Sequence, residues 1–274
     1  MDQILGNSID IAWSGGSATW NILMTVIQSI ITMTPQEIFP DAWQATTETI
    51  LPWFIGAGAA CINMIFMIGF MKQTTNFREN LTLEVFVEGG IRIIIANTLL
   101  MYSQTIMEDF INLATMATKF VMGTEPLKIV NPTLDVGTVL FYFVLGIIYF
   151  IASVVCAGNN LLTVLKRVAY IMFCIIAVPV AAVTFVGDRE MANTGRAAIK
   201  TFFTYCFQIV VIAFWLRIGT LMASGISGLI ISQTNDSGLF DGFYQALNNM
   251  ICMLFMTTLI KNSDELLRKA FDLR

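Results

Sequence analysis

Four long stretches of the chain carry no charged side chain. They are Thr49–Met71, Val136–Leu165, Val168–Gly187 and Gly242–Ile260. A helix needs roughly 20 apolar residues to cross the hydrocarbon core of a bilayer, which is about 30 Å thick. Several stretches meet this length, so the pattern predicts an all-α polytopic membrane protein.

Separate crossings are expected at five places along this pattern, and the second is the weakest. After Arg92, the apolar core of Ile91–Met107 is only 15 residues long, so this segment either crosses thinly or dips and returns. Glu108–Met122, which follows it, is expected to form a separate surface helix. Gly56, Gly58 and Ala60 lie in the first span and are small enough to let helices approach closely. The five expected crossings are Pro52–Met71, Ile91–Met107, Val136–Ala157, Thr201–Ile231 and Phe243–Ile260.

Val168–Val186 is the stretch that does not fit simple alternation. If it crosses as a separate helix, the basic turn that follows it and the basic C-terminus both fall outside the cell, against the positive-inside rule. If it enters, breaks near Pro179 and returns, both fall on the cytoplasmic side. The expected topology is therefore about five crossings plus a re-entrant hairpin, with the N-terminus outside and the C-terminus inside.

The first 49 residues contain no Lys or Arg, and within them Ala18–Met33 has the period of an amphipathic helix. One face is apolar, and the other carries a stripe of polar side chains. Two interpretations stay open: a helix that lies on the bilayer surface, or a helix whose polar stripe faces a water-filled lumen. The apolar face consists of Trp20, Leu23, Met24, Ile27, Ile30 and Ile31, and the polar stripe of Asn21, Thr25, Gln28, Ser29 and Thr32.

These patterns divide the chain into three parts. Residues 1–49 form an extracytoplasmic amphipathic segment, residues 50–260 form the transmembrane domain, and residues 261–274 form a short cytoplasmic helix with alternating charges.

Composition argues against an enzyme. Of all residues 56% are hydrophobic and 12% charged, and histidine, the commonest general base, is absent. The five cysteines stand alone within apolar runs, without metal-ligand spacing, and are interpreted as small buried hydrophobes. No nucleotide-binding glycine loop is present. We therefore expect no catalytic residue, no metal and no cofactor.

The charge balance argues against tight nucleic-acid binding. Fifteen basic residues are outnumbered by 19 acidic ones and are spread over several loops. A duplex-binding surface needs clustered Lys and Arg to replace the counterions of the phosphates. We therefore expect no direct high-affinity binding of DNA or RNA.

Three polar or irregular positions within the apolar runs are candidate functional residues. Pro179 frees a main-chain carbonyl, and Arg217 places a charge near the middle of an expected span, which costs about 2.5–3.5 kcal/mol on the insertion scale. Gln208 lies about two and a half turns before Arg217. Arg217 is either a structural arginine that snorkels or pairs, or a residue of a lumen or subunit interface. The full candidate set for a lumen or subunit interface is Asn21, Thr25, Gln28, Ser29, Thr32, Pro179, Gln208 and Arg217.

Two consecutive apolar runs with a polar turn between them carry a resemblance to a known family. They are LKRVAYIMFCIIAVPVAAVTFVGD, with Arg167 near its start and Pro179 in its centre, and AAIKTFFTYCFQIVVIAFWLRIG, with Lys200 near its start. Gly195 lies in the turn. In the order of these features, 136–229 resembles the TrbL/VirB-six family of polytopic inner-membrane subunits of type IV secretion and conjugation machines. This chain lacks the long soluble extensions of many members.

The resemblance implies a non-enzymatic platform or translocation-channel subunit of the bacterial inner membrane. It further implies a homo-oligomeric ring of about five or six copies. The implied partners are the assembly ATPase, which would supply energy, and pilus-tip or bitopic subunits. The substrate would be DNA or protein. The alternative from a different class is an autonomous small-solute transporter or ion channel, which Arg217 and the break expected at Pro179 would support.

Overall fold

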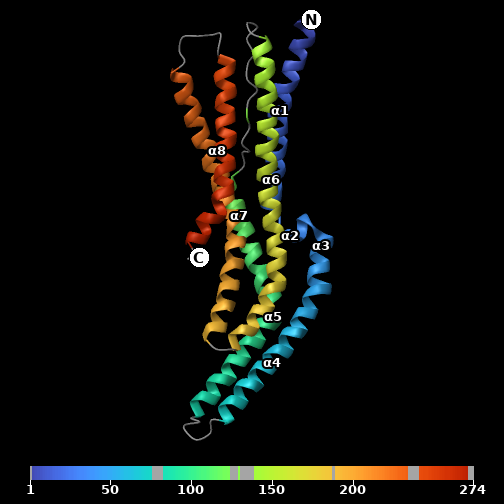
Figure 1. Cartoon of the computed structure of the whole chain (residues 1–274), viewed down its shortest axis with the longest axis vertical. Coiled ribbons are helices and arrows are strands. Elements are labelled where there is room, and N and C mark those ends of the chain that lie inside the picture. Colours follow the sequence, from blue (N-terminus) through green and yellow to red (C-terminus); the bar gives the residue numbers. More distant parts are fainter. Residues whose placement is uncertain are drawn as a thin grey trace. The chain divides into compact units, whose positions relative to one another are not determined.

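The computed structural model describes residues 2–75, 83–123, 129, 139–186, 189–233 and 241–270, and this part of the chain is helical without any strand. The elements in chain order are α1 (Asp2–Thr32), α2 (Pro35–Ile38), α3 (Pro40–Gln44), the π-helical turn η1 (Ala45–Ile50), α4 (Leu51–Thr75), α5 (Leu83–Met122), α6 (Val139–Val183), the 3₁₀ turn η2 (Thr184–Val186), α7 (Arg189–Gln233) and α8 (Asp241–Ala270). The expectation of an all-α protein is confirmed for these residues (Figure 1).

The chain forms two compact units, and α5, α6, α7 and α8 each contribute to both. Unit 1 contains Met1–Met33, Thr115–Lys166 and Gln208–Glu265. Unit 2 contains Thr34–Ala114, Arg167–Phe207 and Leu266–Arg274.

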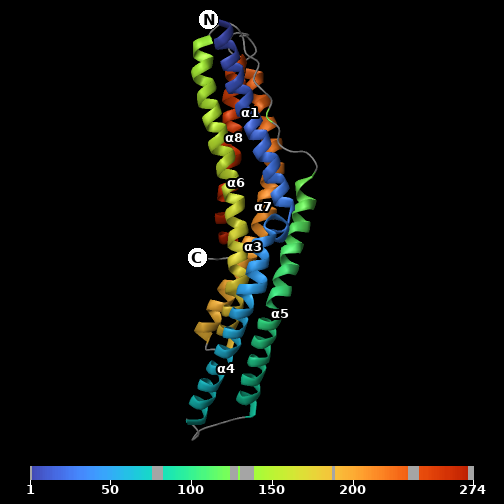
Figure 2. The ribbon, with the colours of Figure 1, turned by 90° about the vertical axis from the view of Figure 1, so that its right-hand side faces the viewer.

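In unit 1, α1 lies beside the first half of α6, and the two helices run in the same direction (Figure 2). The ring centroids of Trp13 and Tyr149 are 4.9 Å apart, and Ser17 shares a 2.9 Å hydrogen bond with the Tyr149 hydroxyl. The Ser153 hydroxyl donates to the Gly16 carbonyl at 2.5 Å. A Cβ at Gly16 would lie 2.8 Å from the Tyr149 ring, so this close approach requires glycine.

The apolar face expected on α1 is confirmed, because Trp20, Met24, Ile27 and Ile31 are at most 3% exposed. Together with Trp13 and Ser17 these positions follow the alternating spacing of four and three residues that is typical of a coiled-coil seam. An interfacial helix inserts its apolar face into the lipid. On α1 this face is already packed against protein, so it is not available to the bilayer. The interfacial interpretation of α1 is therefore wrong.

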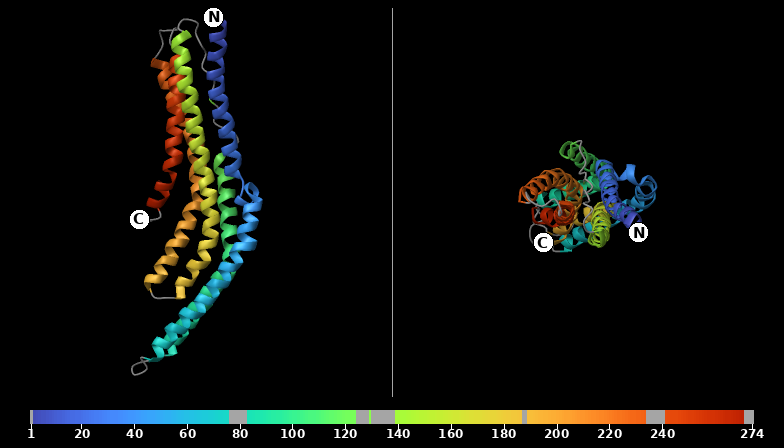
Figure 3. Two further views of the ribbon diagram at one scale, coloured as in Figure 1. Left: turned by 45° about the vertical axis from the view of Figure 1, so that its right-hand side comes forward. Right: turned by 90° about the horizontal axis from the view of Figure 1, so that it is seen from above.

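In unit 2, α4 and the first part of α5 lie side by side as a helical hairpin (Figure 3). The core cluster on these helices and the end of α6 consists of Ile62, Ala96, Leu100 and Val183. A Cβ at Gly58 would come within 3.1 Å of Leu100, whereas one at Gly56 would meet nothing within 4 Å. Close packing through a small residue thus occurs at Gly58 and not at Gly56.

Four helical segments of the described residues are long and apolar enough to cross a membrane: Pro40–Ile68, Phe143–Val183, Asn193–Met222 and Phe243–Ala270. These support a membrane protein, while the expected count of about five crossings plus a hairpin is not confirmed. Ile91–Met107 is not among the four. It continues without a break into Glu108–Met122, so the separate surface helix expected there is part of α5.

The break expected at Pro179 is absent. α6 runs through Pro179 and ends one turn later at Val183, and η2 follows. Proline lacks the N–H that would bond to the carbonyl of Ile175. The neighbouring turns nevertheless stay helical, and Pro179 itself is buried. Membrane helices tolerate proline where neighbouring groups and local 3₁₀ adjustments satisfy the freed backbone groups, and here the 3₁₀ turn η2 follows directly after α6.

Candidate functional site

Arg167 is a buried cation in the middle of α6, only 4% exposed. Its Nε donates to the Tyr205 carbonyl at 2.8 Å, and its terminal Nη2 makes a longer contact of 3.5 Å with the Cys206 carbonyl. Both carbonyls belong to α7, and each carbonyl oxygen has a second lone pair beyond its helical bond. Within the described residues, Arg167 therefore satisfies its charge with main-chain dipoles. An ionisable group inside an apolar bundle is a functional-site candidate.

Tyr205 connects Arg167 to a second arginine. The Tyr205 ring stacks on Tyr170, with centroids 4.9 Å apart and planes inclined by 20°. Arg268, in the last turn of α8, donates to the Tyr205 hydroxyl at 2.9 Å, and its guanidinium carbon lies 5.8 Å from the ring centroid. We call Arg167, Tyr170, Tyr205 and Arg268 the arginine–tyrosine cluster. It ties the end of α8 to α6 and α7 within unit 2.

The basic pair Lys166 and Arg167 stands at the start of an apolar run in the sequence, but the two side chains lie in different surroundings. Lys166 is exposed and Arg167 is buried. The signal was present in the helical period: Asn160, Val164, Arg167 and Ile171 follow one another at four, three and four residues, and all are buried. Arg167 thus falls on the inward stripe of α6.

Arg217 is exposed and lies against the end of α5. One of its terminal nitrogens donates to the Val121 carbonyl at 3.0 Å. Val121 is in the last turn of α5, where carbonyls have no partner within the helix and carry partial negative charge. Gly123 follows with φ +67°, the left-handed conformation common after a helix C-terminus. Arg217 therefore caps α5 in unit 1.

Gln208 and Arg217 are not brought together. Gln208 is buried, and its amide nitrogen lies 3.4 Å from the Ser263 hydroxyl, which in turn donates to the Ile260 carbonyl at 2.7 Å. Nine residues separate Gln208 from Arg217, which is two and a half helical turns, so the two side chains leave α7 on opposite sides.

The polar stripe of α1 is bonded mostly to its own helix. Thr25 donates to the Asn21 carbonyl at 2.8 Å, and Thr32 donates to the carbonyls of Gln28 and Ser29 at 3.2 and 2.9 Å. Asn21 holds Ile129 through two bonds, one in each direction, of 3.1 and 2.9 Å. Thr25 and Ser29 remain exposed, while Asn21, Gln28 and Thr32 are partly buried.

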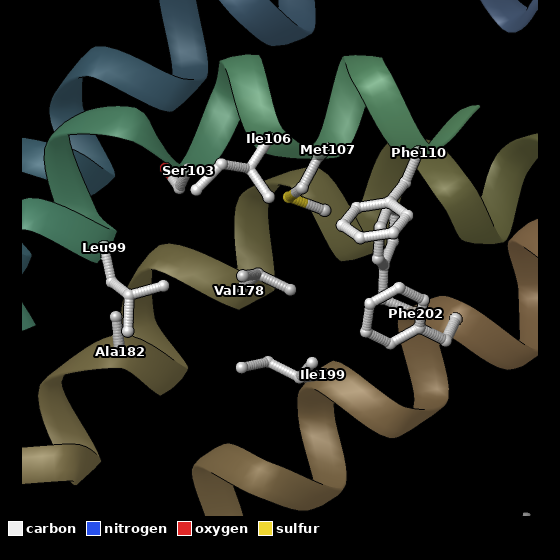
Figure 4. A pocket seen from close by; sticks show the side chains of 10 residues that line it. Leu99, Ser103, Ile106, Met107, Phe110, Val178, Ala182, Ile199 and Phe202 are labelled. Carbon is white, nitrogen blue, oxygen red and sulfur yellow. The ribbon is translucent and has the colours of Figure 1, made fainter. Parts of the chain in front are cut away.

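Pro179 lies between two residues that line an apolar cavity in unit 2. The cavity has a volume of about 120 Å³. Its one polar lining residue is Ser103, whose hydroxyl donates to the Leu100 carbonyl at 2.9 Å. Figure 4 shows the lining side chains pointing into the space between α5, α6 and α7; they are Leu99, Ser103, Ile106, Met107, Phe110, Val178, Ala182, Ile199, Phe202 and Phe203.

The cysteines are mostly where the sequence suggested. Cys156, Cys174, Cys206 and Cys252 are buried and free, but Cys61 is exposed, so the expectation of burial is wrong at that position. The described residues contain no group of three His, Cys, Asp or Glu side chains that could hold a metal ion.

Comparisons with protein-family models, curated proteins and solved structures gave no match to this chain.

Replacing Arg167 by methionine is expected to leave the folded protein as stable as the wild type or slightly more so. The apolar side chain removes a buried charge, and replacing buried ionic groups with packed apolar ones is often neutral or stabilising by about 1–4 kcal/mol. The measurement is thermal unfolding in detergent, followed by the loss of the monodisperse chromatographic peak. Lys166→Met, at the exposed neighbouring position, is the matched control.

A large drop in the unfolding temperature of Arg167→Met alone would contradict this view. It would mean that the bonds to Tyr205 and Cys206 stabilise the bundle by more than the burial of the charge costs.

Proposed function

We propose that the chain is a non-enzymatic platform or translocation-channel subunit of a bacterial type IV secretion machine, working as a homo-oligomer in the inner membrane. The proposed family is TrbL/VirB-six, from the order of basic residue, proline, polar turn and second apolar run in 136–229. Its proposed partners are an assembly ATPase and outer-facing pilus-tip or bitopic subunits.

The observation that carries the proposal is the exposure of Arg217. It lies in the candidate span Asn193–Met222, yet a single chain leaves its side chain exposed, with one hydrogen bond to Val121. A guanidinium has five N–H donors, and exposing it to lipid is costly. Thr25 and Ser29 on α1 are exposed polar groups of the same unit. Neighbouring copies around a polar central space would supply acceptors for the remaining N–H donors of Arg217 and polar surroundings for the two hydroxyls.

The proposed topology has the N-terminus outside and the C-terminus inside. The re-entrant hairpin was needed only because Val136–Ala157 and Val168–Val186 were treated as two elements. In the part of these ranges that the structure assigns to an α-helix, residues 139–157 and 168–183 belong to one helix of 45 residues, α6. If α6 counts as one crossing and α5 also crosses, simple alternation puts the basic turn before α7 and the basic C-terminus on the cytoplasmic side, as the positive-inside rule favours.

Single cysteines at Asn7, Asn235 and Asn262, in a background without other cysteines, test this topology. A membrane-impermeant thiol reagent added to intact cells should label the first two positions and spare the third. In disrupted cells all three should react, which serves as the control. Labelling of Asn262→Cys in intact cells, or protection of Asn235→Cys, would refute the proposed orientation.

Deleting the gene in its host tests the function itself. We expect loss of DNA or protein transfer to recipient cells and recovery when the wild-type gene is supplied. Arg217→Leu should restore transfer poorly, because it removes both the cap on α5 and the proposed contact with a neighbouring copy. Arg189→Leu, at the first residue of α7 and outside the candidate span, should restore it fully.

Normal transfer in the deletion strain would refute the proposed role in secretion. Solute flux through liposomes that contain only this protein would then favour the autonomous transporter.

A further inference from the structure

The lining of the cavity in unit 2 favours the binding of an apolar group. Its walls include Leu99 and Met107 from α5, Val178 and Ala182 from α6, and Phe202 from α7 (Figure 4). The volume of about 120 Å³ is close to that of engineered apolar cavities, roughly 150 Å³, that stay dry and bind benzene. Side chains that border an empty space lose dispersion contacts on that side. A short apolar segment therefore fits this space better than water does.

The surface of unit 2 indicates which class of apolar molecule surrounds it. Large apolar side chains are exposed on its helices, among them Ile94 and Met101 on α5 and Phe173 on α6, at 67%, 74% and 66%. Exposed apolar surface of this kind meets either lipid or another protein. Since α6 has the length and composition of a membrane span, acyl chains are the apolar molecules that surround these helices.

A pair of cations lies on the helix that forms one wall of the cavity. Arg196 and Lys200 are both exposed, and they are separated by one turn of α7. The wall residues Ile199 and Phe203 follow Arg196 at three and seven residues, so they lie on neighbouring parts of the same side of the helix. The unit 2 part of α7, residues 189–207, has three basic residues, Arg189, Arg196 and Lys200, and one acidic residue, Glu190. The net positive charge of this part of α7 therefore favours the binding of a negatively charged group beside the cavity.

We propose that this region binds an anionic phospholipid. Part of an acyl chain occupies the cavity, and the phosphate of the headgroup lies between Arg196 and Lys200. Neither element suffices alone: surface cations attract any anion, and the cavity accepts any slim apolar group. Their positions on one helix face select a molecule that has both parts.

Native mass spectrometry of the purified full-length protein in detergent tests the site. The probes are phosphatidylglycerol and phosphatidylcholine with identical acyl chains. Two basic residues should make phosphatidylglycerol bind about 25-fold more tightly, at about fivefold for each residue. The double variant Arg196→Gln/Lys200→Gln should bind both lipids equally. Lys261→Gln, which removes an exposed charge on α8, should keep the preference.

Two further measurements are needed. One distinguishes the contribution of the cavity from that of the two basic residues, and the other distinguishes binding of a lipid from binding of a free phosphate. Ala182→Phe fills the cavity and should weaken binding of both lipids. Inorganic phosphate should not displace bound phosphatidylglycerol, because it lacks the acyl chain. If Ala182→Phe does not fold, the double variant, whose changes lie on the surface, still decides the question.

Equal binding of the two lipids by the wild type would overturn the proposal. So would a preference for phosphatidylglycerol that survives in the Arg196→Gln/Lys200→Gln protein, or its displacement by inorganic phosphate.

Discussion

The inward stripe of α6 is the constraint on which the packing of both units depends. It carries Tyr149, Ser153, Asn160 and Arg167 among apolar residues, and all four are buried. Away from water each polar group needs a partner. α1 supplies Ser17 and the Gly16 carbonyl to the first two, and α7 supplies two carbonyls to Arg167. These bonds fix which helices lie against α6 and in what register, because apolar packing alone tolerates sliding. Neither amide atom of Asn160 has a partner among the described residues.

The sequence predicted the helical class, the buried face of α1 and most of the apolar spans, because these follow directly from the period and length of apolar runs. It failed at α6, where the pair Lys166 and Arg167 divides two uncharged runs within one helix. Charge was interpreted as a boundary there, although one of the two side chains points inward. At Pro179 the expected break is absent because a proline can be held in a helix by its neighbours, and single-sequence propensity contains no information about neighbours.

The candidate site was predictable only in part, for the same reason. Arg217 was singled out correctly as a charge within a span, but its bond to the Val121 carbonyl depends on where α5 ends in space. That Gln208 and Arg217 leave α7 on opposite sides was predictable from the sequence, because nine residues make two and a half helical turns. The arginine–tyrosine cluster joins α6, α7 and α8 and has no local sequence signature.

The chain exposes both polar and apolar side chains, which favour different surroundings. In unit 1, Arg217 has N–H donors beyond its bond to Val121, and the hydroxyls of Thr25 and Ser29 are exposed, so these groups favour polar surroundings. The exposed residues of α4 and α5, such as Trp53 and Met101, favour apolar surroundings. We propose that further copies of this chain provide the polar surroundings. Native mass spectrometry of the protein extracted in mild detergent measures this directly, because it counts the copies in the complex. We expect a single closed oligomer of about five or six copies. A protein that is monomeric when extracted and still restores transfer would contradict it.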